Sequence, residues 1–181
     1  MRLTVPCLDD GVVALRPPEP DDVDAITAAC QDPEIPRWTR VPSPYTRDHA
    51  VEFVKRSARM WQRGSDAPFA VVDAESNEFL GAIGVHRFDG EDDGPEVGYW
   101  LKRDARGRGV ATRALRLVTD WACRELGVPL TLQADARNAT SRRVAEKVGY
   151  RYVGETAAPP DVNGSDTMAV YRHQAEAPTA R

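Results

Sequence analysis

Residues 103–115, RDARGRGVATRAL, combine residue types that suit the binding of an anion. Gly107 and Gly109 lie directly before a helical pattern, where glycine lets the backbone turn sharply and direct several N–H groups at one point. The first N–H groups of a helix have no partner within it, and the aligned peptide dipoles favour negative charge there. Arg106 and Arg108 add forked donors that match phosphate oxygens. The segment therefore predicts a binding site for two linked phosphates.

Two common nucleotide-binding patterns fit this segment poorly. The Walker A pattern ends in Gly-Lys-Ser/Thr, which is absent. The dinucleotide pattern G-x-G-x-x-G requires a third glycine where the chain has Thr112. A nucleotide-binding enzyme remains an alternative, as does an ordinary strand-to-helix turn with solvated arginines.

Hydrophobic periodicity predicts the elements that position the glycine segment. Short apolar runs predict about seven strands, at residues 11–16, 69–74, 79–89, 97–101, 129–135, 150–155 and 167–173. Helical spacing and end signals predict helices at residues 21–31, 46–64, 110–127 and 139–148. The proline-rich residues 32–44 are expected to form a loop or a short irregular helix. This order predicts an α/β fold whose first half is mostly antiparallel and whose second half runs β-α-β-α-β.

The composition favours one soluble domain that spans residues 1–181. The chain is 41% hydrophobic and 29% charged, with a formal net charge of −4 that gives no argument for nucleic-acid binding. We expect no membrane span and no signal peptide, because no sufficiently long apolar run is present. Three widely spaced cysteines predict free thiols in a cytoplasm, and they do not cluster with histidines, so no metal site is expected. Only three of the 24 basic residues are lysines, which indicates a bacterium with GC-rich DNA.

The pattern R-x-x-G-x-A, from Arg106 to Ala111, resembles the coenzyme A pyrophosphate signature of the GNAT N-acetyltransferase superfamily. The resemblance covers about residues 11–172 and points to the RimJ/RimL-like (ribosomal-protein) branch. Four stretches carry it: ALRPPEPDDVDAI, PYTRDHAVEFV, EVGYWLKRDARGRGVATRAL and NATSRRVAEKVGYRYVGE. It implies a mixed, mostly antiparallel twisted sheet flanked by helices, in which strands 97–101 and 129–135 are parallel neighbours that splay apart, often with a bulge in the first.

The same resemblance implies how acetyl-CoA binds. The pantetheine arm lies between the splayed strands and pairs with main-chain groups, and an N–H near Tyr99 polarises the thioester carbonyl. Asn138 contacts pantetheine or positions the following helix; a plain N-cap is the simpler alternative. The residues expected to bind the coenzyme are Tyr99, Trp100, Leu101, Lys102, Arg106, Gly107, Arg108, Gly109, Val110, Ala111, Thr112, Asn138 and Ser141.

The implied chemistry is direct attack of an amine on the thioester, without a covalent enzyme intermediate. Glu96, at the start of its strand, is the first candidate for the general base, and His86 is the second. Many family members place a tyrosine acid seven residues after the asparagine, where this chain has Ala145. Ser141 is the substitute that the RimL-like branch suggests, although the thiolate can also leave with little help.

The acceptor is expected to be a primary amine, either a protein N-terminus or a small molecule. Arg37 and Trp38 are the candidates for its contacts. Tyr45 and Trp61 lie in the same part of the sequence, where an aromatic residue more often belongs to the core than to a ligand site. Transfer from another acyl-CoA, such as succinyl-CoA, and a non-catalytic acyl-CoA sensor are the functional alternatives. The sequence leaves monomer and homodimer open.

Overall fold

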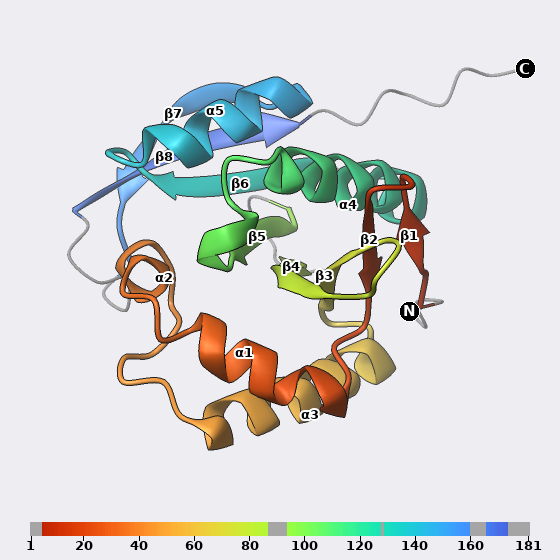
Figure 1. The fold of residues 1–181 in the computed structure, drawn as a ribbon. Coiled ribbons are helices and arrows are strands. Elements are labelled where there is room, and N and C mark those ends of the chain that lie inside the picture. The colour runs from red at the N-terminus through yellow and green to blue at the C-terminus, as the bar shows by residue number, and fades with distance from the viewer. Residues whose placement is uncertain (1–4, 87–93, 128, 160–165, 174–181) are drawn as a thin grey trace, which may run out of the picture.

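An eight-stranded sheet forms the centre of the molecule, with helices on both of its faces (Figure 1). The computed structural model describes residues 5–86, 94–127, 129–159 and 166–173. The strand order is β1-β2-β3-β4-β5-β6-β8-β7, and every neighbouring pair is antiparallel except β5 and β6. The strands are β1 (Leu8–Asp9), β2 (Val13–Arg16), β3 (Ala67–Asp73), β4 (Phe79–His86), β5 (Glu96–Leu101), β6 (Leu130–Asp135), β7 (Arg151–Ala157) and β8 (Thr167–His173).

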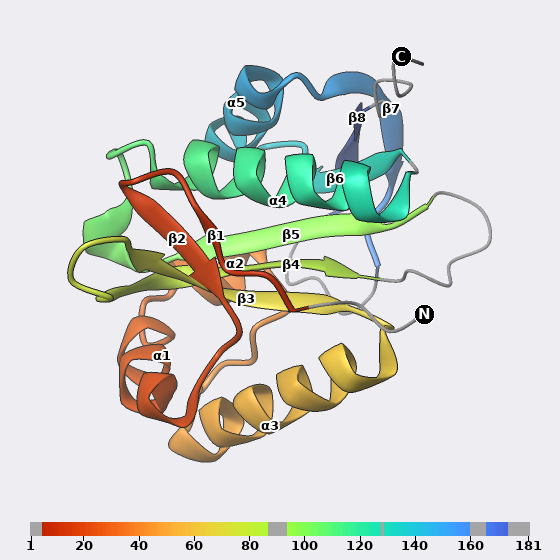
Figure 2. The same ribbon diagram turned by 90° about the vertical axis from the view of Figure 1, so that its right-hand side faces the viewer.

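Helices α1 and α3 cover one face of the sheet, and α4 and α5 cover the other (Figure 2). The helices are α1 (Val23–Ala29), α2 (Glu34–Trp38), α3 (Arg47–Arg63), α4 (Val110–Leu126) and α5 (Ala139–Val148), with 3-10 turns η1 (Pro20–Asp22) and η2 (Arg103–Ala105). Capping fixes the ends of the long helices. Thr46 accepts a hydrogen bond from the His49 amide at the start of α3, and Asn138 does the same for the Ser141 amide at the start of α5.

Each face of the sheet has its own hydrophobic core, because successive strand residues point to opposite faces. Val97 and Leu101 of β5 lie in the core on the α4 face, with Leu115 and Val118 of α4. Trp100 packs against the other core, which the α1 and α3 residues form together with β3 and β4. The side chains of successive β5 residues therefore pack against different hydrophobic cores, one on each face of the sheet.

Strands β5 and β6 are parallel neighbours that pair at one end only. Their register contains two pairs, Glu96 with Thr131 and Val97 with Leu132. The pairing therefore ends before Tyr99, and the strands part toward their carboxyl ends. The predicted splay is confirmed, but the predicted bulge is wrong, since β5 pairs with β4 in unbroken register over its whole length.

The α/β class and the mixed, mostly antiparallel sheet are confirmed. The sheet gains one strand beyond the expected number, because β1 pairs with β2 next to a tight turn. Residues 34–38 form a short helix, which is one of the two alternatives expected for residues 32–44. Residues 87–89 of the predicted strand 79–89 lie outside the described residues. In the part of the chain that is described, no helix has the length and apolar character needed to span a membrane.

Candidate coenzyme and acceptor sites

The glycine segment presents main-chain amides at the start of α4. Gly107 and Gly109 adopt left-handed φ values of 74° and 79°, which other residues adopt only with strain. Gly109 is the N-cap of α4, and no described side chain caps the amides of residues 107–112. A Cβ atom added at either glycine would meet nothing within 4 Å. Space is therefore open beside both glycines, and the first amides of α4 carry the positive end of the helix dipole.

The two arginines of the segment differ in their surroundings. Arg108 is exposed, and its charge acts on the Asp73 carboxylate without a hydrogen bond or a close ion pair between them. Arg106 instead turns its guanidinium back toward β5, where Nε and a terminal nitrogen donate to the Leu101 carbonyl at 3.1 and 2.9 Å. Its other terminal nitrogen lies 2.9 Å from Asp32. In this structure the side chain of Arg108, rather than that of Arg106, is available to a ligand phosphate.

The main chain of β5 offers groups to the gap beside β6. The Lys102 amide donates to the Leu80 carbonyl on β4 at 2.9 Å. Because main-chain groups of successive strand residues point to alternate neighbours, Trp100 also faces β4, whereas Tyr99 and Leu101 face the gap. The Leu101 carbonyl is already bound by Arg106. Of the predicted main-chain contacts, those of Tyr99 are therefore the best placed to meet a ligand in the gap.

Tyr99 and Ser141 bring two hydroxyls together between β5 and α5. The phenolic oxygen of Tyr99 lies 3.0 Å from Ser141 Oγ. Burial raises the pKa of Tyr99 to about 12, although the hydrogen bond with Ser141 opposes this shift. The Asn138 side chain accepts from the Ser141 amide at 3.1 Å, which confirms the N-cap interpretation of Asn138. Ala145, at the position of the family's tyrosine acid, is fully buried in the core.

Glu96 and His86 face the α1 and α3 side of the sheet. They are directly opposite each other on β5 and β4, and His86 Nδ1 lies 3.2 Å from Asp66 Oδ1. The next pair on this face consists of two glycines, Gly84 and Gly98. A Cβ atom at Gly98 would meet nothing within 4 Å, so the sheet is open to approach beside Glu96. Both candidate bases are thus next to the Gly84–Gly98 pair, where an acceptor could approach this face of the sheet.

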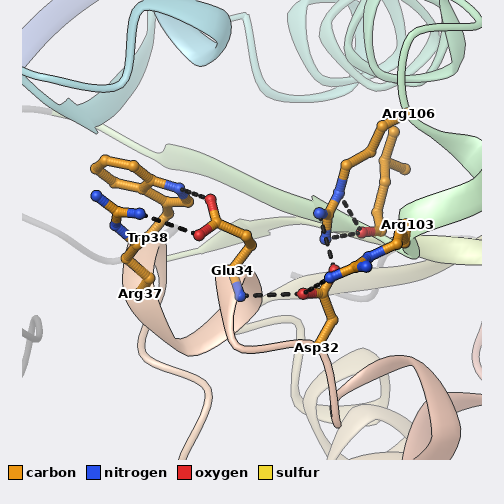
Figure 3. Close-up of polar contacts among 7 residues, drawn as sticks. Asp32, Glu34, Arg37, Trp38, Arg103 and Arg106 are labelled. Atoms are coloured by element: carbon orange, nitrogen blue, oxygen red, sulfur yellow. Dashed lines mark hydrogen bonds and ion pairs between the residues drawn. The ribbon is translucent and has the colours of Figure 1, made fainter.

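The short helix α2 holds its polar groups in a local network (Figure 3). The Glu34 carboxylate accepts from Trp38 Nε1 at 3.0 Å and from Arg37 at 3.1 Å. The Arg37 guanidinium lies over the Trp38 ring, 4.6 Å from its centroid. The structure therefore brings the two predicted acceptor residues together. Trp61, by contrast, is buried against Phe69, which confirms its core role.

Three features of the site were not predicted from the sequence: Asp32, Asp66 and the side-chain contact of Tyr99. Their partners are distant in sequence, so spacing gives no signal for them. The structure also places Cys123 Sγ 3.8 Å from His173 Nδ1. Burial raises the pKa of the Cys123 thiol, which disfavours the thiolate that a nucleophile needs. The sequence did not indicate this Cys–His contact, and the absence of a covalent intermediate stays a prediction.

Comparison with known proteins assigns the family. The model of the acetyltransferase (GNAT) domain matches residues 13–151, and the chain belongs to this family of acyltransferases. The uncharacterized N-acetyltransferase p20 of Bacillus licheniformis is 23% identical and covers 78% of this chain and 80% of its own length. The putative ribosomal N-acetyltransferase YdaF of Bacillus subtilis is 32% identical over 50% of each chain.

A solved structure shares the whole fold. The structure of RimL, a ribosomal L7/L12 alpha-N-protein acetyltransferase in complex with coenzyme A, superposes with a TM-score of 0.82. It is 18% identical and covers 93% of this chain and 98% of its own. The predicted resemblance to RimL thus holds for the fold, and identity at this level carries neither activity nor substrate from one protein to the other.

Proposed function

We propose that this protein transfers an acetyl group from acetyl-CoA to a primary amine by direct attack on the thioester. The observation that carries the proposal is the uncapped row of amides at Gly107–Thr112, at the start of a long helix and beside the opening of β5 and β6. Helix N-termini of this kind suit a diphosphate. Arg108 adds a positive charge at the same place. The opening between β5 and β6 then leads from the proposed phosphate site toward Tyr99 and Ser141.

In the proposed reaction, the amine nitrogen bonds to the thioester carbonyl carbon and the carbon–sulfur bond breaks. The Tyr99 amide donates to the carbonyl oxygen as negative charge develops there. Glu96 accepts the proton that the amine loses, directly or through water, and His86 with Asp66 is the alternative base. Ser141, hydrogen-bonded to Tyr99, donates a proton to the leaving thiolate.

The proposed acceptor approaches from the α1 and α3 face of the sheet. Gly98 leaves that face open next to Glu96, and α2 presents Arg37 and Trp38. Support for a protein N-terminus comes from the relative named as an L7/L12 alpha-N-protein acetyltransferase, and a small-molecule amine fits the same chemistry. We further propose a cytoplasmic location, which the three unpaired cysteines support.

The test is thiol release from acyl-CoA donors in the presence of an amine panel that includes N-terminal peptides, amino acids and polyamines. We expect turnover with acetyl-CoA and a slower rate with succinyl-CoA. A thermal-shift measurement with CoA, ATP and NAD accompanies it, and CoA is expected to raise the Tm most. CoA binding without turnover on any amine would favour a sensor, and stabilisation by ATP or NAD instead of CoA would contradict the phosphate assignment.

A further inference from the structure

Asp32 contacts both the coenzyme segment and the acceptor segment. It lies between α1 and α2, and its side chain is 8% exposed. Oδ1 accepts from the Glu34 amide at 3.2 Å and from Arg103 at 3.3 Å. Oδ2 lies 2.9 Å from Arg106, as an ion pair without the alignment of a hydrogen bond. One carboxylate thus touches three residues from two separate segments (Figure 3).

On the acceptor side, this contact reaches the polar groups of α2. Glu34 begins α2, and its amide donates to Asp32. The Glu34 carboxylate in turn binds Trp38 Nε1 and Arg37. A shift of Asp32 would therefore move the start of the helix that carries both candidate acceptor residues.

On the coenzyme side, the contact reaches the residues directly before the glycine segment. Arg103 begins the turn η2, and Arg106 follows it and also binds the Leu101 carbonyl at the end of β5. Arg106 is adjacent in sequence to Gly107, the first residue of the amide row. Holding the Arg106 guanidinium in place therefore positions the first residue of the glycine segment, and it also holds the end of β5 beside the opening to β6.

The electrostatics of Asp32 favour a permanent anion. Burial by itself would raise the pKa of its carboxyl, but hydrogen bonds from Arg103 and the Glu34 amide, together with the charge of Arg106, lower the pKa overall. Two guanidinium groups share this single charge. A carboxylate held this way has a defined position rather than the freedom of a solvated surface group.

We propose that Asp32 is a positioning residue that links acceptor binding to coenzyme binding, by holding the start of α2 and the entry to the glycine segment in one arrangement. This inference rests on the proposed function. Because linkage is reciprocal, coenzyme bound at the glycine segment favours the acceptor-ready arrangement of α2, and an acceptor held by α2 favours coenzyme binding by the same factor.

The experiment measures CoA binding by calorimetry and, in parallel, the tryptophan emission change that CoA causes. In the wild-type protein we expect CoA to change the emission, and Trp38→Phe identifies the part that belongs to Trp38. Asp32→Asn keeps the size of the side chain and an acceptor for the Glu34 amide but removes the charge. We expect it to weaken CoA binding about tenfold, within the usual range of coupling between sites, and to abolish the Trp38 response at saturating CoA.

Three further variants separate positioning from folding. Asp24→Asn removes an exposed ion pair with Arg47 and is expected to change neither readout. Asp32→Glu retains the charge and is expected to bind CoA more tightly than Asp32→Asn. Arg103→Gln removes one partner at an exposed position, so it keeps the fold and is expected to weaken the Trp38 response even if Asp32→Asn folds poorly.

The outcomes distinguish this inference from the proposed function. Wild-type CoA affinity and an unchanged Trp38 response in Asp32→Asn and Arg103→Gln would overturn the linkage and leave the acetyltransferase proposal intact. Absence of CoA binding to the wild-type protein would overturn the proposed function itself.

Discussion

The phenolic oxygen of Tyr99 on β5 lies 3.0 Å from the hydroxyl oxygen of Ser141 on α5. This contact joins the two sides of the opening between the parallel strands. It also places the Tyr99 hydroxyl next to Ser141, the proposed acid. The position of the family's usual tyrosine acid is occupied by Ala145, which is buried. The pair therefore gives a direct test of how the thiolate receives its proton.

We expect Ser141→Ala to lower kcat about 100-fold, as loss of a general acid does. Tyr99→Phe removes one neutral hydrogen bond, so a decrease of about tenfold is expected. In the double variant the two effects should not add, because both residues act through one proton path. Steady-state kinetics of the four proteins checks this, and full additivity would mean that Tyr99 has no share in proton transfer.

Tyr99 also predicts a pH dependence of stability. Its pKa is raised to about 12 from 10.0, so its contribution to folding is fully present below pH 10.0 and is lost as the pH rises through about 12. The free energy of unfolding of the wild-type protein should therefore fall more steeply over this interval than that of Tyr99→Phe. Urea unfolding at several alkaline pH values measures the difference, and equal slopes would contradict the raised pKa.

Glu96→Gln tests the proposed base. We expect the rate to fall about 100-fold at the lower end of the pH range and less at high pH, where more of the amine is already neutral. The pH profile of kcat with one amine gives the measurement, and Glu125→Gln, at an exposed position of α4, is the matched control. An unchanged profile would remove Glu96 from the mechanism and leave His86 as the candidate.

The open face beside Glu96 predicts the effect of adding a side chain at Gly98. Gly98→Val places its Cβ in space with no atom within 4 Å, so we expect the fold to be retained and the KM for the amine to rise about tenfold. Gly81→Ala is the contrasting variant on β4, because its Cβ would lie 2.3 Å from the Trp100 carbonyl oxygen. This variant should lower the Tm instead. A normal KM in Gly98→Val would place the acceptor elsewhere.

Gly109→Val tests the phosphate site. The backbone φ of 79° strains a branched residue by about 1–3 kcal/mol, and its side chain would enter the space in front of the amides. We expect the Kd for CoA to rise more than tenfold with a moderate loss of Tm. Gly127→Val provides the control, since Gly127 has a φ of 63° at the other end of α4 and should share the strain without the effect on CoA.

The sequence predicted the elements whose signals are local. The helices α3, α4 and α5 have strong periodicity and clear caps, and their bounds differ from the predicted ones by no more than the terminal residues. The glycine segment was found because left-handed glycines before a helix form a compact pattern. Strand β1 escaped prediction because it has two residues and forms only by pairing with β2.

The side-chain network of the site could not be predicted in the same way. Asp32 reaches Arg103 across 71 residues, and Tyr99 reaches Ser141 across 42. Such contacts depend on how the sheet brings the segments together, and no spacing rule encodes them. For the same reason, Arg106 and Arg108 were predicted alike as phosphate ligands, whereas the fold directs the Arg106 guanidinium toward Leu101 and Asp32.

The short pairing between β5 and β6 has a mechanical consequence. Strands β1–β5 on one side and β6–β8 on the other share a ladder of two residue pairs, so much of their cohesion comes from α4 lying across both. A pantetheine arm that hydrogen-bonds to both strands would add main-chain hydrogen bonds between the two half-sheets. Dissociation of CoA would then leave the two half-sheets freer to move against each other. Hydrogen exchange of the main-chain amides of β5 and β6 would measure this difference.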